Sequence, residues 1–162
     1  MLTERKQLVV RCLDFLSSLA NSGRQELAPF LTSEVFVGHL VRLLGEEEKE
    51  IRHFTYSLVS DIGKKYDLSL YAEQLVTAVG GNLDKGSLTS LNNALMCLTD
   101  MLTTYPALQT HLPAVLERTV TVFKTHKVIL TALSWSRFSL LTSHASSADW
   151  PYSDLPSPKM FS

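Results

Sequence analysis

The sequence predicts an all-α fold, in the form of a short α-solenoid of about three to four stacked helical repeats. Apolar residues recur at spacings of three and four along most of the chain, and glycine, serine or proline separates the apolar segments. No stretch alternates apolar and polar residues cleanly enough to predict a strand. Similar segments return at intervals of 37 to 47 residues, which is typical of repeats made of two or three helices.

The composition is that of one ordinary globular domain. The chain has 162 residues, is 45% hydrophobic and 19% charged, and carries a formal net charge of -1. We therefore expect no direct binding to nucleic acid and no electrostatic attraction to a membrane. Two cysteines are too few for a disulfide scaffold and favour an intracellular location, nuclear or cytoplasmic. No apolar run reaches the length of a membrane span.

The clearest repeat unit lies between Leu40 and Tyr66. An apolar stripe ends at Gly45, a natural helix stop, and Glu46–Glu48 follow at the start of the next helix, where negative charge is favourable. Gly63, with Lys64 and Lys65, is predicted to close that helix. Its predicted core residues, which recur at helical spacing, are Ile51, Phe54, Leu58, Val59 and Ile62.

Capping and stop residues predict the other helices. These lie at residues 3–22 (Thr3 as cap, Gly23 as stop), 25–31, 33–44 (Ser33 as cap), 69–79 (Ser69 as cap), 87–104 (Ser87 as cap), 112–123 and 127–143. Val35 is a predicted core residue, and Leu8, Cys12 and Phe15 are apolar positions that fit the first helix. Residues 144–162 are rich in serine and proline, so we expect residues 1–143 to form the repeat domain and residues 144–162 a disordered tail.

An internal repeat carries the solenoid prediction. The ten residues ending at Tyr66 align with the ten ending at Tyr105, and the alignment places Asp61 opposite Asp100, 100 − 61 = 39 residues later. Shared aspartate and tyrosine positions are more informative than shared leucines, because leucine recurs in any amphipathic helix.

Two fainter copies extend the repeat. Asp14 lies near the matching position 61 − 14 = 47 residues before Asp61, and Arg137 lies 137 − 100 = 37 residues after Asp100. The alternative is a compact helical bundle whose similar segments arise by chance; curvature and a common stacking direction distinguish the two.

The segment from residue 40 to 62 resembles one repeat of the armadillo/HEAT-like superfamily. The resemblance rests on an apolar first helix and on the start and apolar end of the last helix, namely Leu40, Val41, Leu43, Leu44, Glu50, Ile51, Arg52, Val59 and Ile62. It extends weakly over residues 75–105. The resemblance implies a fold used for binding protein partners.

The chain departs from the armadillo proteins that bind extended peptides. Asp61 and Asp100 stand where that family has asparagine, and Ser57 and Met96 stand where it has tryptophan. A carboxylate does not donate a hydrogen bond as an amide does, so the resemblance does not imply nuclear-signal binding in the manner of importin-α. The two aspartates favour a basic helix or peptide instead, unless they only satisfy local backbone or lysine partners.

The sequence contains none of the motifs that would indicate chemistry. There is no HExxH, no zinc spacing of cysteines, no glycine-rich phosphate loop and no GxSxG. We therefore expect no catalytic, cofactor or metal site. The acidic run from Glu46 to Glu50 is predicted to be a solvated face. Trp135 is a candidate partner contact, with core packing as the alternative.

The expected function is that of a non-catalytic protein-interaction scaffold. The alternatives are a compact helical adaptor that acts through its tail and an armadillo-type adaptor in transport or signalling. The degenerate repeats are also similar to the meiosis inhibitor type of armadillo-like scaffold, a resemblance that implies a role in the machinery of meiotic double-strand breaks. Because neither end of the array has an obviously polar outer side, we expect self-association through open ends, or a chain that is a fragment or shortened form of a longer repeat protein.

Overall fold

The protein folds into helices joined by short turns. The computed structural model describes residues 2–126; the predicted helix at residues 127–143, the predicted tail and Trp135 lie outside the described residues. Residues 2–126 contain no strand, which confirms the all-α prediction for this part of the chain. The helices are α1 (Leu2–Asn21), the 3-10 helix η1 (Gln25–Leu27), α2 (Ala28–Leu31), α3 (Glu34–Leu44), α4 (Lys49–Lys65), α5 (Ala72–Gly80), α6 (Leu88–Thr104), the 3-10 helix η2 (Pro106–His111) and α7 (Leu112–His126).

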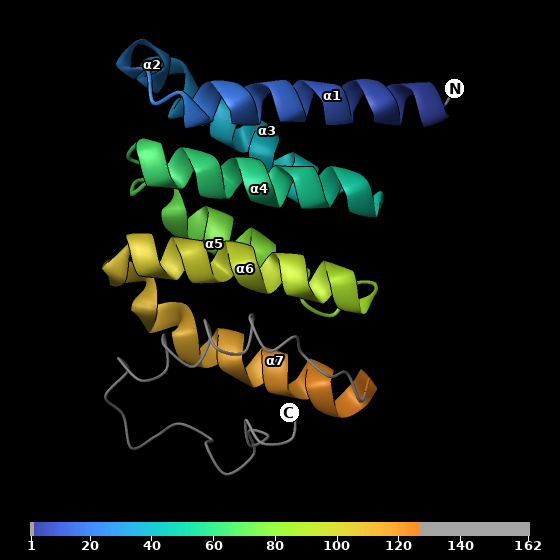
Figure 1. Ribbon diagram of the computed structural model, residues 1–162. Coiled ribbons are helices and arrows are strands. Elements are labelled where there is room, and N and C mark those ends of the chain that lie inside the picture. The colour runs from blue at the N-terminus through green and yellow to red at the C-terminus, as the bar shows by residue number, and fades with distance from the viewer. Residues whose placement is uncertain (1, 127–162) are drawn as a thin grey trace.

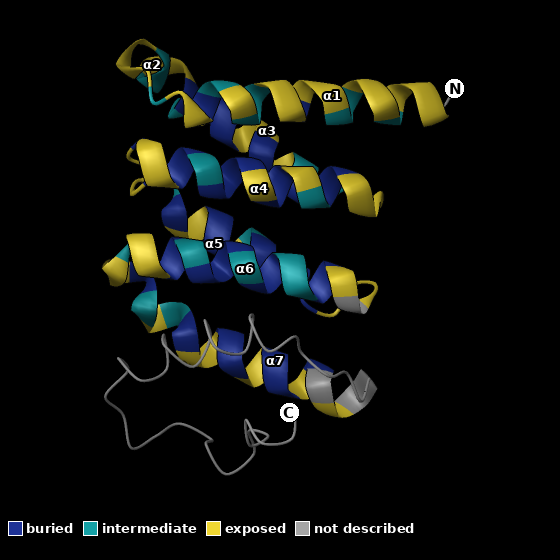
Figure 2. Ribbon diagram, in the orientation of Figure 1, coloured by how far each residue is buried: buried dark blue, intermediate teal, exposed yellow. Residues whose placement is uncertain are grey.

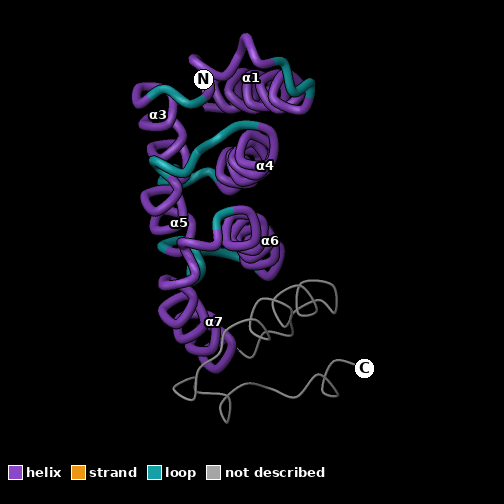
Figure 3. The backbone as a smooth tube through the Cα atoms, turned by 90° about the vertical axis from the view of Figure 1, so that its left-hand side faces the viewer, coloured by secondary structure: helices purple, strands orange, loops and turns teal. Residues whose placement is uncertain are grey.

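The helices form two layers. The long helices α1, α4 and α6 lie side by side in one layer, and each begins at the right-hand side of Figure 1. Seen from the side, α3, α5 and α7 form a second layer against them (Figure 3). The chain alternates between the layers, so that each passage through both layers adds one long helix to the row.

An apolar core lies between the layers. Leucine and isoleucine side chains at helical spacing on α3, α4, α5 and α6 are fully buried, and the buried bands of neighbouring helices face one another in Figure 2. The largest fully buried side chains on these four helices are Leu40, Leu44, Leu58, Ile62, Leu75, Leu95, Leu98, Met101 and Leu102.

Several predicted helix boundaries are confirmed. The Ser33 hydroxyl accepts a hydrogen bond from the backbone N–H of Phe36 (3.2 Å), and the Ser87 hydroxyl accepts one from the N–H of Ser90 (3.4 Å). Both are side-chain N-caps of the ordinary kind. Gly23 follows α1 with a φ of 66°, a left-handed conformation that favours glycine.

Two predicted caps are wrong. Thr3 lies inside α1 and does not cap it. The N–H of Ser69 donates to Asp67 Oδ1 (2.9 Å) in a local turn, and α5 begins further along the chain. The predicted close of α4 is confirmed, because the helix ends at Lys65. Gly63 in its last turn has a second role: a Cβ atom there would sit 3.3 Å from Met101 Sδ, so the missing side chain permits α6 to approach α4 closely.

Two predicted core residues are exposed: the exposed fractions are 73% for Val35 and 37% for Phe54. Apolar positions of α1 are exposed too, with fractions of 64% for Leu8 and 63% for Phe15, and Cys12 is exposed as well. Helical spacing identifies an apolar face but does not say whether another helix covers it. In the described part of the chain, α1 is the first member of its row, so its outer face, at the top of Figure 2, has no helix packed against it.

Polar contacts between elements follow a single sequence interval. The Tyr66 hydroxyl donates to the carbonyl oxygen of Arg24 (3.0 Å), and the Tyr105 hydroxyl lies 3.1 Å from the carbonyl oxygen of Gly63; both contacts span 42 residues. Other hydrogen bonds and ion pairs between distant residues of the described chain span similar intervals, from 34 residues (Arg118 to Asp84) to 44 residues (Ser17 to Asp61). These contacts therefore join elements that lie about one such interval apart in the chain.

Candidate functional site

The candidate site is a groove of about 420 Å³ that runs over the row of long helices. Helix α1 contributes two of its lining residues, and α4 and α6 contribute the others. The lining residues are Asp14, Ser17, His53, Phe54, Tyr56, Ser57, Ser60, Asp61, Lys64, Asn93, Met96, Cys97 and Asp100.

Four of the five residues that the sequence singled out meet in this groove. Ser57 and Asp61 lie on α4, and Met96 and Asp100 lie on α6, at positions related by the 39-residue interval. The fifth, Trp135, lies outside the described residues. The sequence alignment placed the four residues at equivalent repeat positions, and the stacking of α6 beside α4 brings those positions to one surface.

The two aspartates are each held by the preceding long helix. Ser17 Oγ on α1 donates a hydrogen bond to Asp61 Oδ2. Lys64 Nζ on α4 lies 3.2 Å from Asp100 Oδ2. Asp100 therefore has a lysine partner, as the alternative from the sequence allowed, whereas the partner of Asp61 is a serine hydroxyl on another helix. A carboxylate has about four lone-pair sites, so one donor leaves each aspartate with further acceptor capacity.

Asp14 is a third carboxylate of this kind that the sequence suggested only faintly. It is exposed, and its carboxylate makes no hydrogen bond or ion pair with any residue in the range 2–126. One pattern links the three positions: Ser17 follows Asp14 by three residues, and Lys64 follows Asp61 by three residues. Residues three apart lie on the same helix face. The donor that follows each aspartate by three residues therefore contacts the equivalent aspartate on the next long helix.

The groove is electronegative. Its lining has three aspartates and one lysine, a formal charge of 1 − 3 = -2 if the histidine is neutral. Burial, followed by the positive charge of Arg52, lowers the pKa of His53, and the ring Nε2 lies 2.9 Å from Ser90 Oγ. His53 therefore adds no full positive charge at neutral pH, and the groove favours a cationic ligand.

The only thiol on the groove surface is a poor nucleophile. Cys97 is 2% exposed, and burial raises the pKa of its thiol to about 12. The thiolate is the reactive form of cysteine, and its population at neutral pH is negligible at that pKa. This environment does not support catalysis by Cys97.

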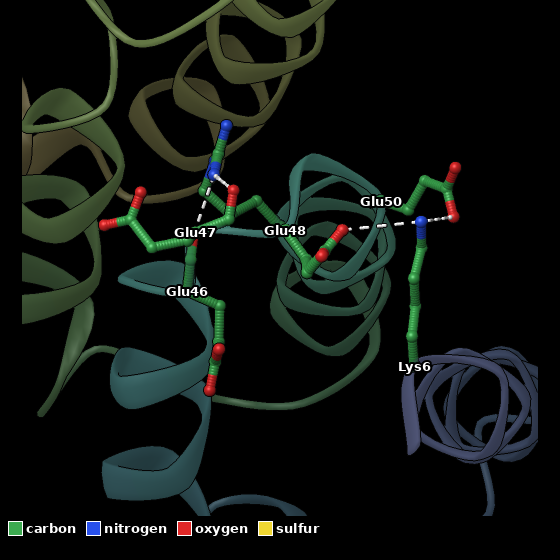
Figure 4. Close-up of polar contacts among 6 residues, drawn as sticks. Lys6, Glu46, Glu47, Glu48 and Glu50 are labelled. Carbon is green, nitrogen blue, oxygen red and sulfur yellow. Dashed lines mark hydrogen bonds and ion pairs between the residues drawn. The ribbon is translucent and has the colours of Figure 1, made fainter. Parts of the chain in front are cut away.

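The acidic run at residues 46–50 is mostly exposed, as the sequence predicted, and it also pairs with α1. Figure 4 shows Lys6 of α1 between Glu48 and Glu50, with Nζ 3.4 Å and 2.9 Å from their carboxylates. The hydrogen bond from Lys6 lowers the pKa of Glu50, and the same bond raises the pKa of Lys6. The run is therefore a solvated face that also links α4 to α1.

A buried arginine holds the backbone of the same turn. Arg52 is 5% exposed, and its Nη1 donates to the carbonyl oxygens of Glu46 and Glu47, both at 2.7 Å. A buried guanidinium needs such acceptors, because an unpaired buried charge is strongly unfavourable. Arg52, which the sequence suggested only as part of a family pattern, thus fixes the turn between α3 and α4.

No metal site or single membrane span is found in the described part of the chain. Residues 2–126 contain no group of three or more His, Cys, Asp or Glu side chains able to hold a metal ion. No single helix in that range is long and apolar enough to cross a membrane; only Gln25–Leu31 and Glu34–Leu44 together, across a 65° bend, have the required length and composition. Val37, Leu40 and Leu44 of that pair are buried in the core.

Comparisons with known proteins give no relative. A scan against protein-family models, a search of curated proteins and a search of solved structures each found no match to this chain. The functional conclusion therefore depends on the geometry of the groove.

Proposed function

We propose that the protein is a non-catalytic interaction scaffold, built as a short armadillo/HEAT-like α-solenoid, that holds a basic segment of a partner protein in the groove. The observation that carries the proposal is the placement of Asp61 and Asp100 at the same repeat position on adjacent helices, within one groove of net negative charge.

The solenoid part of the proposal draws support from the uniform spacing of the long-range contacts. In a stacked array each repeat touches only its neighbours, so contacts are confined to one repeat length. A compact bundle would also place sequence-distant helices, such as first and last, in contact. The equivalent bonds of Tyr66 and Tyr105 to carbonyl oxygens 42 residues earlier favour the array.

The spacing of the carboxylates suggests the form of the ligand. Packed helices lie about 8–10 Å apart, so Asp61 and Asp100 are separated by roughly that distance along the row. A peptide in the polyproline II conformation has three residues per turn and advances about 3.1 Å per residue, so side chains three residues apart lie on the same side and about 9 Å apart. We therefore expect lysine or arginine at every third position of the bound segment.

Fluorescence polarisation with a designed peptide tests the proposal. The probe is a labelled extended peptide with lysine at every third position, and the comparison peptide carries glutamate at those positions. We expect salt-dependent binding of the lysine peptide only, because exposed ion pairs weaken as ionic strength rises.

Matched variants locate the binding. The double variant Asp61→Asn/Asp100→Asn is expected to weaken binding at least tenfold. The control Glu26→Gln/Glu117→Gln removes the same charge from exposed residues outside the groove and is expected to bind as the wild type does. Equal weakening in both variants would refute binding in the groove. A place in the meiotic double-strand-break machinery stays a prediction from the resemblance alone.

A further inference from the structure

The outer face of α1 carries apolar side chains that the described fold leaves uncovered. Leu8 and Phe15 are 64% and 63% exposed and lie seven residues apart on one side of the helix. The 47-residue interval that relates Asp14 to Asp61 relates Leu8 to Thr55 (8 + 47 = 55) and Phe15 to Ile62 (15 + 47 = 62). Both α4 residues are fully buried. The same helix face is therefore covered on α4 and exposed on α1.

Two unpaired charges flank these apolar residues. Arg11 and Asp14 are exposed, and neither side chain makes a hydrogen bond or ion pair with a residue between positions 2 and 126. The equivalent aspartates Asp61 and Asp100 each receive a donor from the preceding helix. Among Asp14, Asp61 and Asp100, Asp14 alone has no such donor within the described residues.

The order of these side chains is self-complementary. Along α1 the sequence is apolar Leu8, cationic Arg11, anionic Asp14 and apolar Phe15, arranged almost symmetrically about Cys12. In an antiparallel pair of α1 helices centred on Cys12, opposite residue numbers add to 24. The numbers of Leu8 and Phe15 add to 23, so Leu8 of one copy lies at nearly the same height along the helix pair as Phe15 of the other (8 + 15 = 23). The numbers of Arg11 and Asp14 add to 25, so these two residues are matched equally closely (11 + 14 = 25). One residue corresponds to about 1.5 Å along a helix.

The angular positions agree with this pairing. At about 100° per residue, Leu8, Cys12 and Phe15 lie to one side of the centre of the outer face, and Arg11 and Asp14 lie to the other. A two-fold axis between antiparallel helices brings the same side of each helix together. Apolar residues therefore meet apolar residues, and each arginine meets an aspartate.

We propose that α1 is a dimerisation helix, through which two copies of this chain pack antiparallel about a two-fold axis near Cys12. Leu8 of each copy contacts Phe15 of the other, and Arg11 of each copy pairs with Asp14 of the other. Such an interface is isologous and closed, so it gives a dimer and not a filament. One helix per copy is a small interface, and we expect a dissociation constant of about micromolar or weaker. The dimer does not depend on the function proposed for the groove.

The two cysteines provide a direct measurement of this geometry. Cys12 is exposed and lies at the proposed axis, whereas Cys97 is buried. Mild oxidation with copper phenanthroline should form a disulfide between the Cys12 residues of two copies. The covalent dimer should form in the Cys97→Ser variant and be absent in the Cys12→Ser variant.

Sedimentation velocity of the reduced full chain over a concentration series provides the second measurement. The wild-type mass is expected to rise from 18.1 kDa toward twice that value. Leu8→Gln/Phe15→Gln should raise the dissociation constant at least tenfold without lowering the thermal midpoint, because both side chains are exposed in the monomer.

Charge exchange separates this interface from other modes of association. Arg11→Asp alone and Asp14→Arg alone should each weaken the dimer, and the double exchange Arg11→Asp/Asp14→Arg should restore it, because the pairing is reciprocal. A monomer at all concentrations without a Cys12 disulfide would overturn the proposal. So would association that is insensitive to these substitutions.

Discussion

The hydroxyl of Tyr105 offers the sharpest test of how the ends of α4 and α6 are joined. It accepts a hydrogen bond from the backbone N–H of Leu68 (2.9 Å) and lies 3.1 Å from the carbonyl oxygens of both Gly63 and Tyr66. One phenolic group at the end of α6 thus satisfies backbone groups at the end of α4. Tyr105→Phe removes the hydroxyl and leaves the ring, so the change isolates these hydrogen bonds from the packing of the side chain.

The expected cost follows from the number of groups left without a partner. An unsatisfied buried donor or acceptor costs about 1–3 kcal/mol. Tyr105 is half-buried, and water partly replaces the hydroxyl, so we expect the free energy of unfolding to fall by about 1.5–3 kcal/mol. Tyr66→Phe loses one bond, to the carbonyl oxygen of Arg24, and is expected to cost about 0.5–1.5 kcal/mol.

Urea unfolding followed by circular dichroism provides the measurement. Tyr71→Phe is the matched control, because the Tyr71 hydroxyl makes no hydrogen bond to a residue in the range 2–126. We expect that control to change the stability by less than about 0.5 kcal/mol, and all three variants to keep the wild-type m-value. If Tyr105→Phe costs no more than Tyr71→Phe, the tyrosine bonds do not hold adjacent repeats together.

Three further predictions concern buried groups. Leu58 is fully buried in the middle of α4, so Leu58→Ala should cost roughly 2–5 kcal/mol in urea unfolding; a change within about half a kcal/mol would contradict its core placement. In the reduced protein, a thiol reagent should modify Cys12 at once and Cys97 only after denaturant is added, because burial keeps the Cys97 thiol protonated; rapid modification of both would contradict the burial. Burial lowers the pKa of His53 in the folded state, so the unfolded state binds its proton more readily and stability is lost as pH falls through the unfolded pKa of about 6.5. Between pH 7.5 and 5.5 the wild type should therefore lose more stability than His53→Gln does, and equal losses would exclude His53 as a cause.

The sequence by itself determined the helical class and several helix boundaries. Helical spacing, the serine caps at Ser33 and Ser87 and the stop at Gly23 are local properties, because capping and backbone preference depend on a few adjacent residues. The 39-residue alignment of Asp61 with Asp100 is also a property of the sequence alone. It identified four residues that share one groove.

Only the tertiary structure decided which faces are covered and which charges are paired. Leu8 and Phe15 have the spacing of core residues yet are exposed, because burial depends on a neighbouring helix and not on the helix itself. The sequence placed Gly63 at a helix end, but its contact with α6 was not predictable, since the close approach of α6 is a property of packing. Lys6 and the glutamates it binds are more than 40 residues apart, and no local pattern connects them. The stacking of the long helices brings such residues together, and it also turns an alignment of aspartates into a groove.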